Sequence, residues 1–138
     1  MKKFCFAIAF VLLFSTLLSG CDINEGNKSK FYWIPEESYF VDYKIIDDEV
    51  VFSYSICFVN EWDEDYAVDI SAKFKKTELR NWIEYKGFYL GTSTDNVIKG
   101  NSKKNIIYCF EGKYLGGKVN TDISFPTEII LSTYFPTA

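Results

Sequence analysis

The residues that decide the fold run from Val50 to Val59 (VVFSYSICFV), where apolar side chains alternate with smaller, more polar ones. Ser53 and Ser55 fall on one face of an extended chain, and the opposite face is apolar, with Val50, Phe52, Tyr54, Ile56 and Phe58. Successive side chains of a β-strand point to opposite faces, so this period of two predicts a strand with one buried face. One-sided alternation is typical of an antiparallel sheet whose other face meets solvent.

The same period extends to both sides of this strand. Residues 39–45 alternate in the same way, and Asp47-Asp48 is expected to form the turn that follows them. Beyond the acidic loop of residues 60–65, residues 66–75 carry apolar side chains on one face and charged or hydroxyl side chains on the other. The sequence therefore predicts three consecutive antiparallel strands joined by short loops.

Shorter runs of the same kind continue toward the C-terminus. We expect strands around residues 83–90, 105–111 and 123–135, and a short helical turn is compatible with residues 76–82. Short strands at regular spacing, separated by turn signals, are the pattern of a sandwich. Residues 31–138 are therefore predicted to form one all-β domain, an antiparallel β-sandwich.

The charge balance and the absence of histidine exclude several classes of function. Lys2 and Lys3 are the only charged residues among the first 20, so the remaining 118 carry 13 positive and 19 negative side chains. An acidic domain lacks the basic face that nucleic-acid binding requires, so no nucleic acid is expected as a partner. Because the chain has no histidine, serine–histidine catalysis, cysteine–histidine catalysis and histidine-based metal sites are excluded.

The N-terminus has the layout of a secretory signal. Met1-Lys2-Lys3 is a short positive segment, and Phe4 to Leu18 (FCFAIAFVLLFSTLL) is an apolar run. A stable membrane span needs about 20 apolar residues, so this run is short for an anchor. A charged start, a brief apolar core and small residues after it are typical of a cleaved signal peptide.

Leu18-Ser19-Gly20-Cys21 (LSGC) resembles the lipobox of bacterial lipoproteins, in which an aliphatic and two small residues precede a cysteine. The resemblance implies that the thiol of Cys21 receives a diacylglyceryl group and that a signal peptidase cuts between Gly20 and Cys21, removing residues 1–20. Fatty acyl chains such as palmitate would then hold the protein on a membrane, because each buried methylene contributes about 0.8 kcal/mol.

Residues 21–30 are predicted to form the lipidated cysteine and a flexible tether. The segment after Cys21 (DINEGNKSK) is polar, and a coil of nine residues spans about 17 Å. Asp22 resembles the signal that retains lipoproteins in the inner membrane of enteric bacteria. The expected location is thus the bacterial cell envelope, and for an enteric source the inner membrane, facing the periplasm.

The segment from Val97 to Phe110 resembles the glycine-containing corner and following strand of immunoglobulin-like domains in small bacterial lipoproteins. The resemblance implies an immunoglobulin-like sandwich. Cys57 and Cys109 lie on two predicted strands in an oxidising compartment, superficially as in the immunoglobulin disulfide. Both share a face with polar residues, however, so a disulfide between them and two free thiols remain alternatives.

The acidic loop around Trp62 is the sharpest local candidate for a binding site. Asp63, Glu64 and Asp65 follow the tryptophan, and dense carboxylates suit Ca²⁺ or a basic partner. The spacing does not match the calcium loop of EF-hands, and the glycine that such a loop needs is missing, so no metal site is predicted. A solvated turn is the plainer interpretation. As a binding site, the loop would use Trp62 as an apolar anchor inside an acidic rim.

No motif for catalysis or a cofactor is recognised. The glycines after residue 111 lack the strand-to-helix context of a phosphate loop, so no cofactor is expected. The sequence favours a non-enzymatic envelope lipoprotein that binds or scaffolds another envelope protein. The alternative is an inhibitor or immunity protein whose acidic domain blocks a toxin or hydrolase.

Overall fold

The computed structural model describes residues 30–137, so the predicted signal peptide, Cys21 and most of the tether lie outside the described residues. Antiparallel strands dominate this part of the chain: β1 (Phe31–Ile46), β2 (Glu49–Asn60), β3 (Tyr66–Lys73), β4 (Phe88–Gly91), β5 (Val97–Ile98), β6 (Ser102–Lys113) and β7 (Glu128–Tyr134). One short helix, α2 (Lys76–Leu79), is also present. No helix among the described residues is long and apolar enough to cross a membrane.

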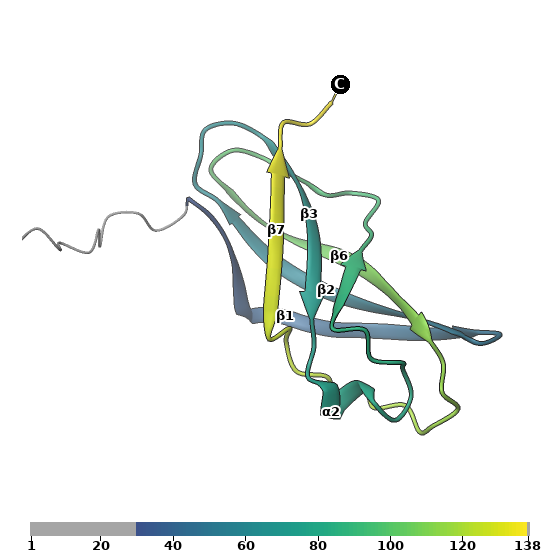
Figure 1. The fold of residues 1–138 in the computed structure, drawn as a ribbon. Coiled ribbons are helices and arrows are strands. Elements are labelled where there is room, and N and C mark those ends of the chain that lie inside the picture. The colour runs from purple at the N-terminus through teal and green to yellow at the C-terminus, as the bar shows by residue number, and fades with distance from the viewer. Residues whose placement is uncertain (1–29, 138) are drawn as a thin grey trace, which may run out of the picture.

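The strands form two antiparallel sheets, which confirms the all-β, sandwich-like prediction (Figure 1). In the first sheet, β2 lies between β1 and β6. In the second, β3 lies between β7 on one side and β4 and β5 on the other, because β4 and β5 pair with different parts of β3. The chain therefore crosses from one sheet to the other after β2, after β5 and after β6.

The core lies between the sheets and is largely aromatic. Phe52 of β2 is fully buried and packs against Phe110 of the neighbouring strand and Phe74 beyond the end of β3, with ring centroids 5.4 and 5.2 Å apart. Trp82 closes one end of the core, and its indole nitrogen donates to the carbonyl of Glu78, 3.0 Å away. Close packing of aromatic side chains buries a large apolar area in a small domain.

Backbone hydrogen bonds join the edges of the two sheets along one side of the described domain. Thr92, just after β4, exchanges two backbone hydrogen bonds with Cys109 of β6 (2.8 and 2.9 Å), and Ile83 bridges to Tyr114. On the opposite side, β1 and β7 are the free edges of their sheets within residues 30–137. The sandwich is thus closed along β4 and β6 and open between β1 and β7.

Strand β1 departs from regular pairing at two points. Ile34 pairs with Cys57 and Tyr39 with Ser55, so residues 35–38 stand opposite a single residue and bulge from the strand. A second bulge follows at residue 41. Because a bulged residue is unpaired, it changes which face the following side chains occupy.

The second bulge overturns the expected alternation of residues 39–45. Tyr39 shares the outer face with Ser55, whereas Tyr43 lies on the core-facing side and pairs with Phe52. The expected helical turn is present as α2, and the strand expected from residue 83 begins only at residue 88. No strand forms at residues 115–127, so the last one starts at Glu128.

Candidate functional site

The acidic loop does not present Trp62 as a free anchor. The side chain is only partly exposed and packs against the core. It stacks on Phe31 at 6.0 Å between ring centroids and approaches Tyr66 at 4.7 Å. The indole thus completes the packing between β1 and β3, and its exposed part is what remains for the predicted role as an apolar anchor.

Two of the three predicted carboxylates hold the loop against the turn between β5 and β6. Asp63 Oδ1 accepts from the side-chain amide of Asn101 (2.7 Å), and Asp65 Oδ1 accepts from the backbone N–H of Gly100 (2.9 Å). Glu64 is exposed. A Cβ on Gly100 would collide with the carbonyl of Asp63, so only glycine allows this close approach.

Asn60 organises this corner, and sequence reasoning missed it. Its buried side-chain amide donates to the carbonyls of Glu64 (2.9 Å), Lys99 (3.2 Å) and Ile98 (3.3 Å), while its Oδ1 accepts from the N–H of Trp62 (3.0 Å). The only sign of this role in the sequence is that a single amide residue ends a largely apolar strand. A buried polar group needs such partners.

Cys57 and Cys109 are free thiols in the structure. Both lie on the outer face of the first sheet, but Cys57 pairs with Asn105 and Cys109 with Ser53, four positions away along the ladder. Four residues of strand span about 13 Å, whereas a disulfide needs Cα atoms within about 7 Å. The pairing that the sequence left open is therefore not made.

The two thiols differ in their surroundings. Cys57 is fully buried, although it lies on the face predicted to be wet, because residues 35–38 fold over it. Its thiol donates to Glu37 Oε2 (3.6 Å), and burial together with this carboxylate raises the pKa of the thiol above its usual value. Such a thiol is a poor nucleophile. Cys109 is partly exposed and approaches the hydroxyl of Ser53 at 3.6 Å.

Glu37, in the same bulge, forms a short ion pair on the outer face of the first sheet. The ammonium of Lys103 lies 2.6 Å from Glu37 Oε2, and the hydrogen bond between them lowers the pKa of the Glu37 carboxyl. The side-chain amide of Asn105 donates to the Glu37 carbonyl and to the hydroxyl of Ser55. These contacts fix the bulge over β2.

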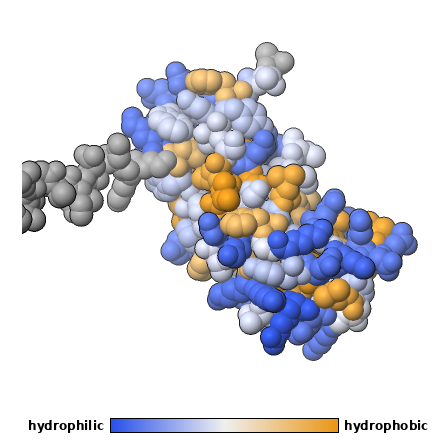
Figure 2. Space-filling view, in the orientation of Figure 1, coloured by the Kyte–Doolittle hydropathy of each residue, from blue (hydrophilic) through white to orange (hydrophobic). Residues whose placement is uncertain are grey.

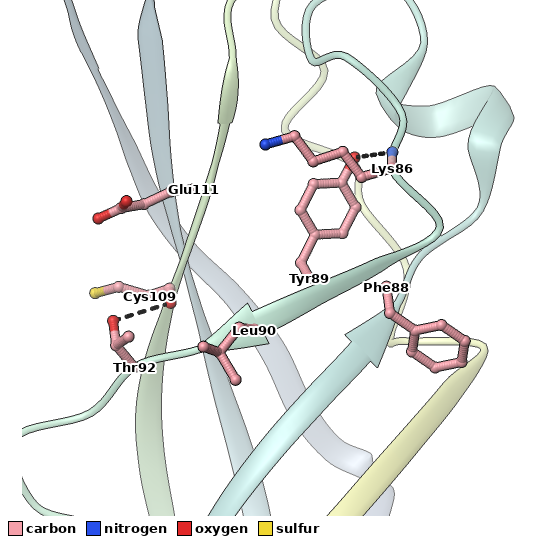
Figure 3. A pocket seen from close by; sticks show the side chains of 7 residues that line it. All are labelled: Lys86, Phe88, Tyr89, Leu90, Thr92, Cys109 and Glu111. Atoms are coloured by element: carbon pink, nitrogen blue, oxygen red, sulfur yellow. Dashed lines mark hydrogen bonds between the residues drawn. The ribbon is translucent and has the colours of Figure 1, made fainter.

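A groove runs along the closed side of the sandwich, where β4 meets β6. Three adjoining hollows of about 280, 290 and 420 Å³ share lining residues and form this β4–β6 groove. Its middle is lined by Lys86, Phe88, Tyr89, Leu90, Thr92, Cys109 and Glu111 (Figure 3). The groove is shallow and open, so it suits a surface contact better than an enclosed small molecule.

Exposed apolar side chains lie in the middle and at one end of the groove. Leu90 is 69% exposed and Ile107 is 52% exposed, and Phe88 is exposed as well. Lys86 and Glu111 stand on opposite sides of the middle hollow, the first beside β4 and the second on β6 (Figure 3). An apolar centre with charged borders resembles the composition of protein interfaces.

The groove reaches the end of the domain that is distant from residue 30. The hollow of about 290 Å³ at this end is lined by Asp48 and Glu49 of the β1–β2 hairpin together with Lys113. Residue 30, in contrast, lies beside the acidic loop, because the N–H of Glu61 donates to the Lys30 carbonyl at 2.7 Å. The acidic loop and the hairpin therefore occupy opposite ends of β2.

Among residues 30–137, no three cysteine, aspartate or glutamate side chains come together in a way that could hold a metal ion. Comparison of the chain with known protein families, with curated proteins and with solved structures found no match.

Proposed function

We propose that this chain is a lipoprotein of the bacterial cell envelope, anchored through lipid on Cys21, whose β-domain binds another envelope protein without catalysing a reaction. The Leu18-Ser19-Gly20-Cys21 motif after a charged start and an apolar run supports the anchor. The polar segment before Phe31 supports a tether, since β1 begins immediately after it.

Substitution of Cys21 tests the anchor. Mass spectrometry of the native protein should show loss of residues 1–20 and the added mass of a diacylglyceryl group. The Cys21→Ser variant should carry no lipid and leave the membrane fraction, and Cys109→Ser is the matched control because its thiol lies outside the motif. An acylated Cys21→Ser protein that stays on the membrane would contradict the anchor.

One observation carries the binding role: the β4–β6 groove exposes Leu90 between Lys86 and Glu111, exposes Ile107 at one end, and extends to the end distant from residue 30. A domain tethered at residue 30 would direct this end away from the lipid surface. Contiguous apolar surface of this kind marks interaction sites on soluble domains. Burial of these side chains by a partner would supply the hydrophobic part of the affinity.

The groove is tested by crosslinking in intact membranes. The double substitution Leu90→Asp and Ile107→Asp should reduce capture of the partner at least roughly tenfold, which corresponds to about 1.4 kcal/mol. Val41→Asp is the control, because Val41 is an exposed apolar residue in the second bulge of β1. Equal capture by the double variant and by wild type would refute the groove as the binding surface.

A second candidate is an inhibitor or immunity protein that blocks a toxin or hydrolase at the envelope. The acidic balance of residues 21–138 favours it. Charge complementarity mainly speeds association and depends on salt. A complex that weakens strongly between low and moderate salt would favour the inhibitor, whereas a salt-insensitive complex favours the scaffold.

We also infer that the sandwich is of the immunoglobulin-like type. The supporting observation is the pairing of β2 with β6 in one sheet and of β3 with β7 in the other. This arrangement has the crossing connections of a Greek key. An experimental structure of the domain would test it, and a different strand order would contradict it.

A further inference from the structure

The free edge of β7 differs from that of β1, although both border the open side of the sandwich. Edge strands usually carry proline, charge or bulges that discourage pairing with another chain. Strand β1 has all three, with Pro35, two bulges, and charges such as Glu36 and Lys44. Strand β7 reads EIILSTY, in which Glu128 is the one charged residue.

The core-facing side of β7 is incompletely covered. Ile129, Leu131 and Thr133 pair with Ala72, Ile70 and Val68, which are buried on the inner face of β3. Even so, Ile129 and Leu131 are only partly buried, and Thr133 is exposed. Inner-face residues with this much exposure indicate that a neighbouring strand would bury further apolar surface.

The outer side of β7 is apolar as well. Ile130 is 54% exposed and Tyr134 is 40% exposed, and Phe135 follows the strand with 64% exposure. Figure 2, in which β7 faces the viewer, shows hydrophobic surface over the middle of this strand. Within residues 30–137, β7 pairs with β3 alone, so the backbone groups on its far edge have no strand partner.

The sequence of β7 is complementary to itself in the antiparallel direction. If two copies pair about a twofold axis at Leu131, Glu128 of one copy faces Tyr134 of the other, so the two carboxylates do not oppose each other. Ile129 then faces Thr133, and Ile130 faces Ser132 with the second Ile130 on the diagonal. Cross-strand pairs of this kind each contribute roughly 0.2–1 kcal/mol.

We propose that two copies of this chain associate through β7, forming an antiparallel β7–β7 pair centred on Leu131 that joins their second sheets into one continuous sheet. Only an extended chain can match the free backbone edge of β7, and a self-complementary strand with a single charged residue makes a second copy the fitting occupant. The contact is isologous and closes after two copies. The proposal does not depend on the lipid anchor or on the β4–β6 groove.

Oligomeric state is measured by native mass spectrometry of the full-length protein released from mild detergent. Wild type is expected at twice the mass of one chain. Ile130→Lys places a charge in the β7–β7 contact and should raise the dissociation constant of the dimer roughly tenfold or more. Ile46→Lys is the matched control, because Ile46 is 60% exposed at the end of β1, in the other sheet. A monomeric wild type, or the same mass for both lysine variants, would overturn the proposal.

Disulfide trapping tests the register. In a Cys109→Ser background, Leu131→Cys places two cysteines directly opposite each other, whereas Thr133→Cys places them four strand positions apart, about 13 Å. Mild oxidation in membranes should therefore link Leu131→Cys chains above the level of the Cys109→Ser background. Thr133→Cys chains should stay at that level. Preferential linkage of Thr133→Cys, or no linkage of either variant, would contradict the proposed pairing.

Discussion

Asn60 is the residue on which the corner between the sheets depends most. One buried amide satisfies three carbonyls and one N–H from two separate loops, at distances of 2.9 to 3.3 Å. Its removal breaks all four of these hydrogen bonds, and a buried group left without a partner costs about 1–3 kcal/mol. A single side chain therefore holds together segments that lie 38 residues apart in the sequence.

We expect Asn60→Ala to lower the free energy of unfolding by about 3 kcal/mol, because the corner loses the four hydrogen bonds of this buried amide. Chemical denaturation followed by circular dichroism measures the change. Asn120→Ala is the control, since Asn120 makes a single local hydrogen bond to the N–H of Asp122 and should change stability by less than about 0.5 kcal/mol. Similar stabilities of the two variants would refute the organising role of Asn60.

At the scale of single elements, the bulge of residues 35–38 has a direct chemical consequence. It covers Cys57 completely, while Cys109 on the same face stays partly exposed. Both the cover and the raised pKa of Cys57 lower its fraction of accessible thiolate. The bulge thus sets the reactivity of a residue on the neighbouring strand.

We expect a thiol reagent to label Cys109 quickly in the folded protein and Cys57 only after unfolding. Peptide mapping after brief alkylation at neutral pH measures the two rates. Deletion of the pair Glu36 and Glu37 should expose Cys57 and speed its labelling. Equal labelling of both cysteines in the intact, folded protein would show that the bulge does not cover the thiol.

The sequence predicts some elements better than others for physical reasons. Residues 50–59 and 66–73 lie in the central strands of the two sheets, each with one face toward the core. Burial of that face imposes the alternation that reveals the strands. The faces of β1 could not be predicted, because its bulges insert residues that no local pattern marks. Residues 123–125 alternate like a strand yet find no partner strand in the described fold.

The candidate site was harder to predict than the fold. The acidic residues were visible in the sequence, but their binding to the turn at residues 99–101 depends on a contact between distant segments. The β4–β6 groove likewise arises where two strands from different sheets meet. The sequence shows where the charged residues are. Only the fold shows which of them already form hydrogen bonds or ion pairs within the domain.

For the whole molecule, the aromatic core links stability to alkaline pH. Burial, with a smaller effect of the Glu78 charge, raises the pKa of Tyr54 to about 12. Burial also raises the pKa of Tyr108. Tyrosine in the unfolded chain titrates near pH 10. Each raised pKa means that the folded state keeps a proton that the unfolded state has lost, so stability is retained below pH 10 and falls as the pH rises toward 12.

We expect the free energy of unfolding to drop between pH 9 and pH 11, with Tyr54 alone contributing a loss of about 1 kcal/mol. Urea titrations at several pH values measure the decline. Tyr54→Phe removes one of the tyrosines whose pKa is raised and should show a shallower decline than wild type. An equally steep decline in this variant would contradict the assigned role of Tyr54.

The position of residue 30 at one end of β1 also determines how the domain bears a mechanical load. A pull applied between residue 30 and the far end of the β4–β6 groove is directed along β1, β2 and β6, which run side by side over most of their length. Such a pull loads the hydrogen bonds between these strands together in shear, instead of breaking them one after another. The three strands are therefore oriented to resist a force applied between these two ends of the domain.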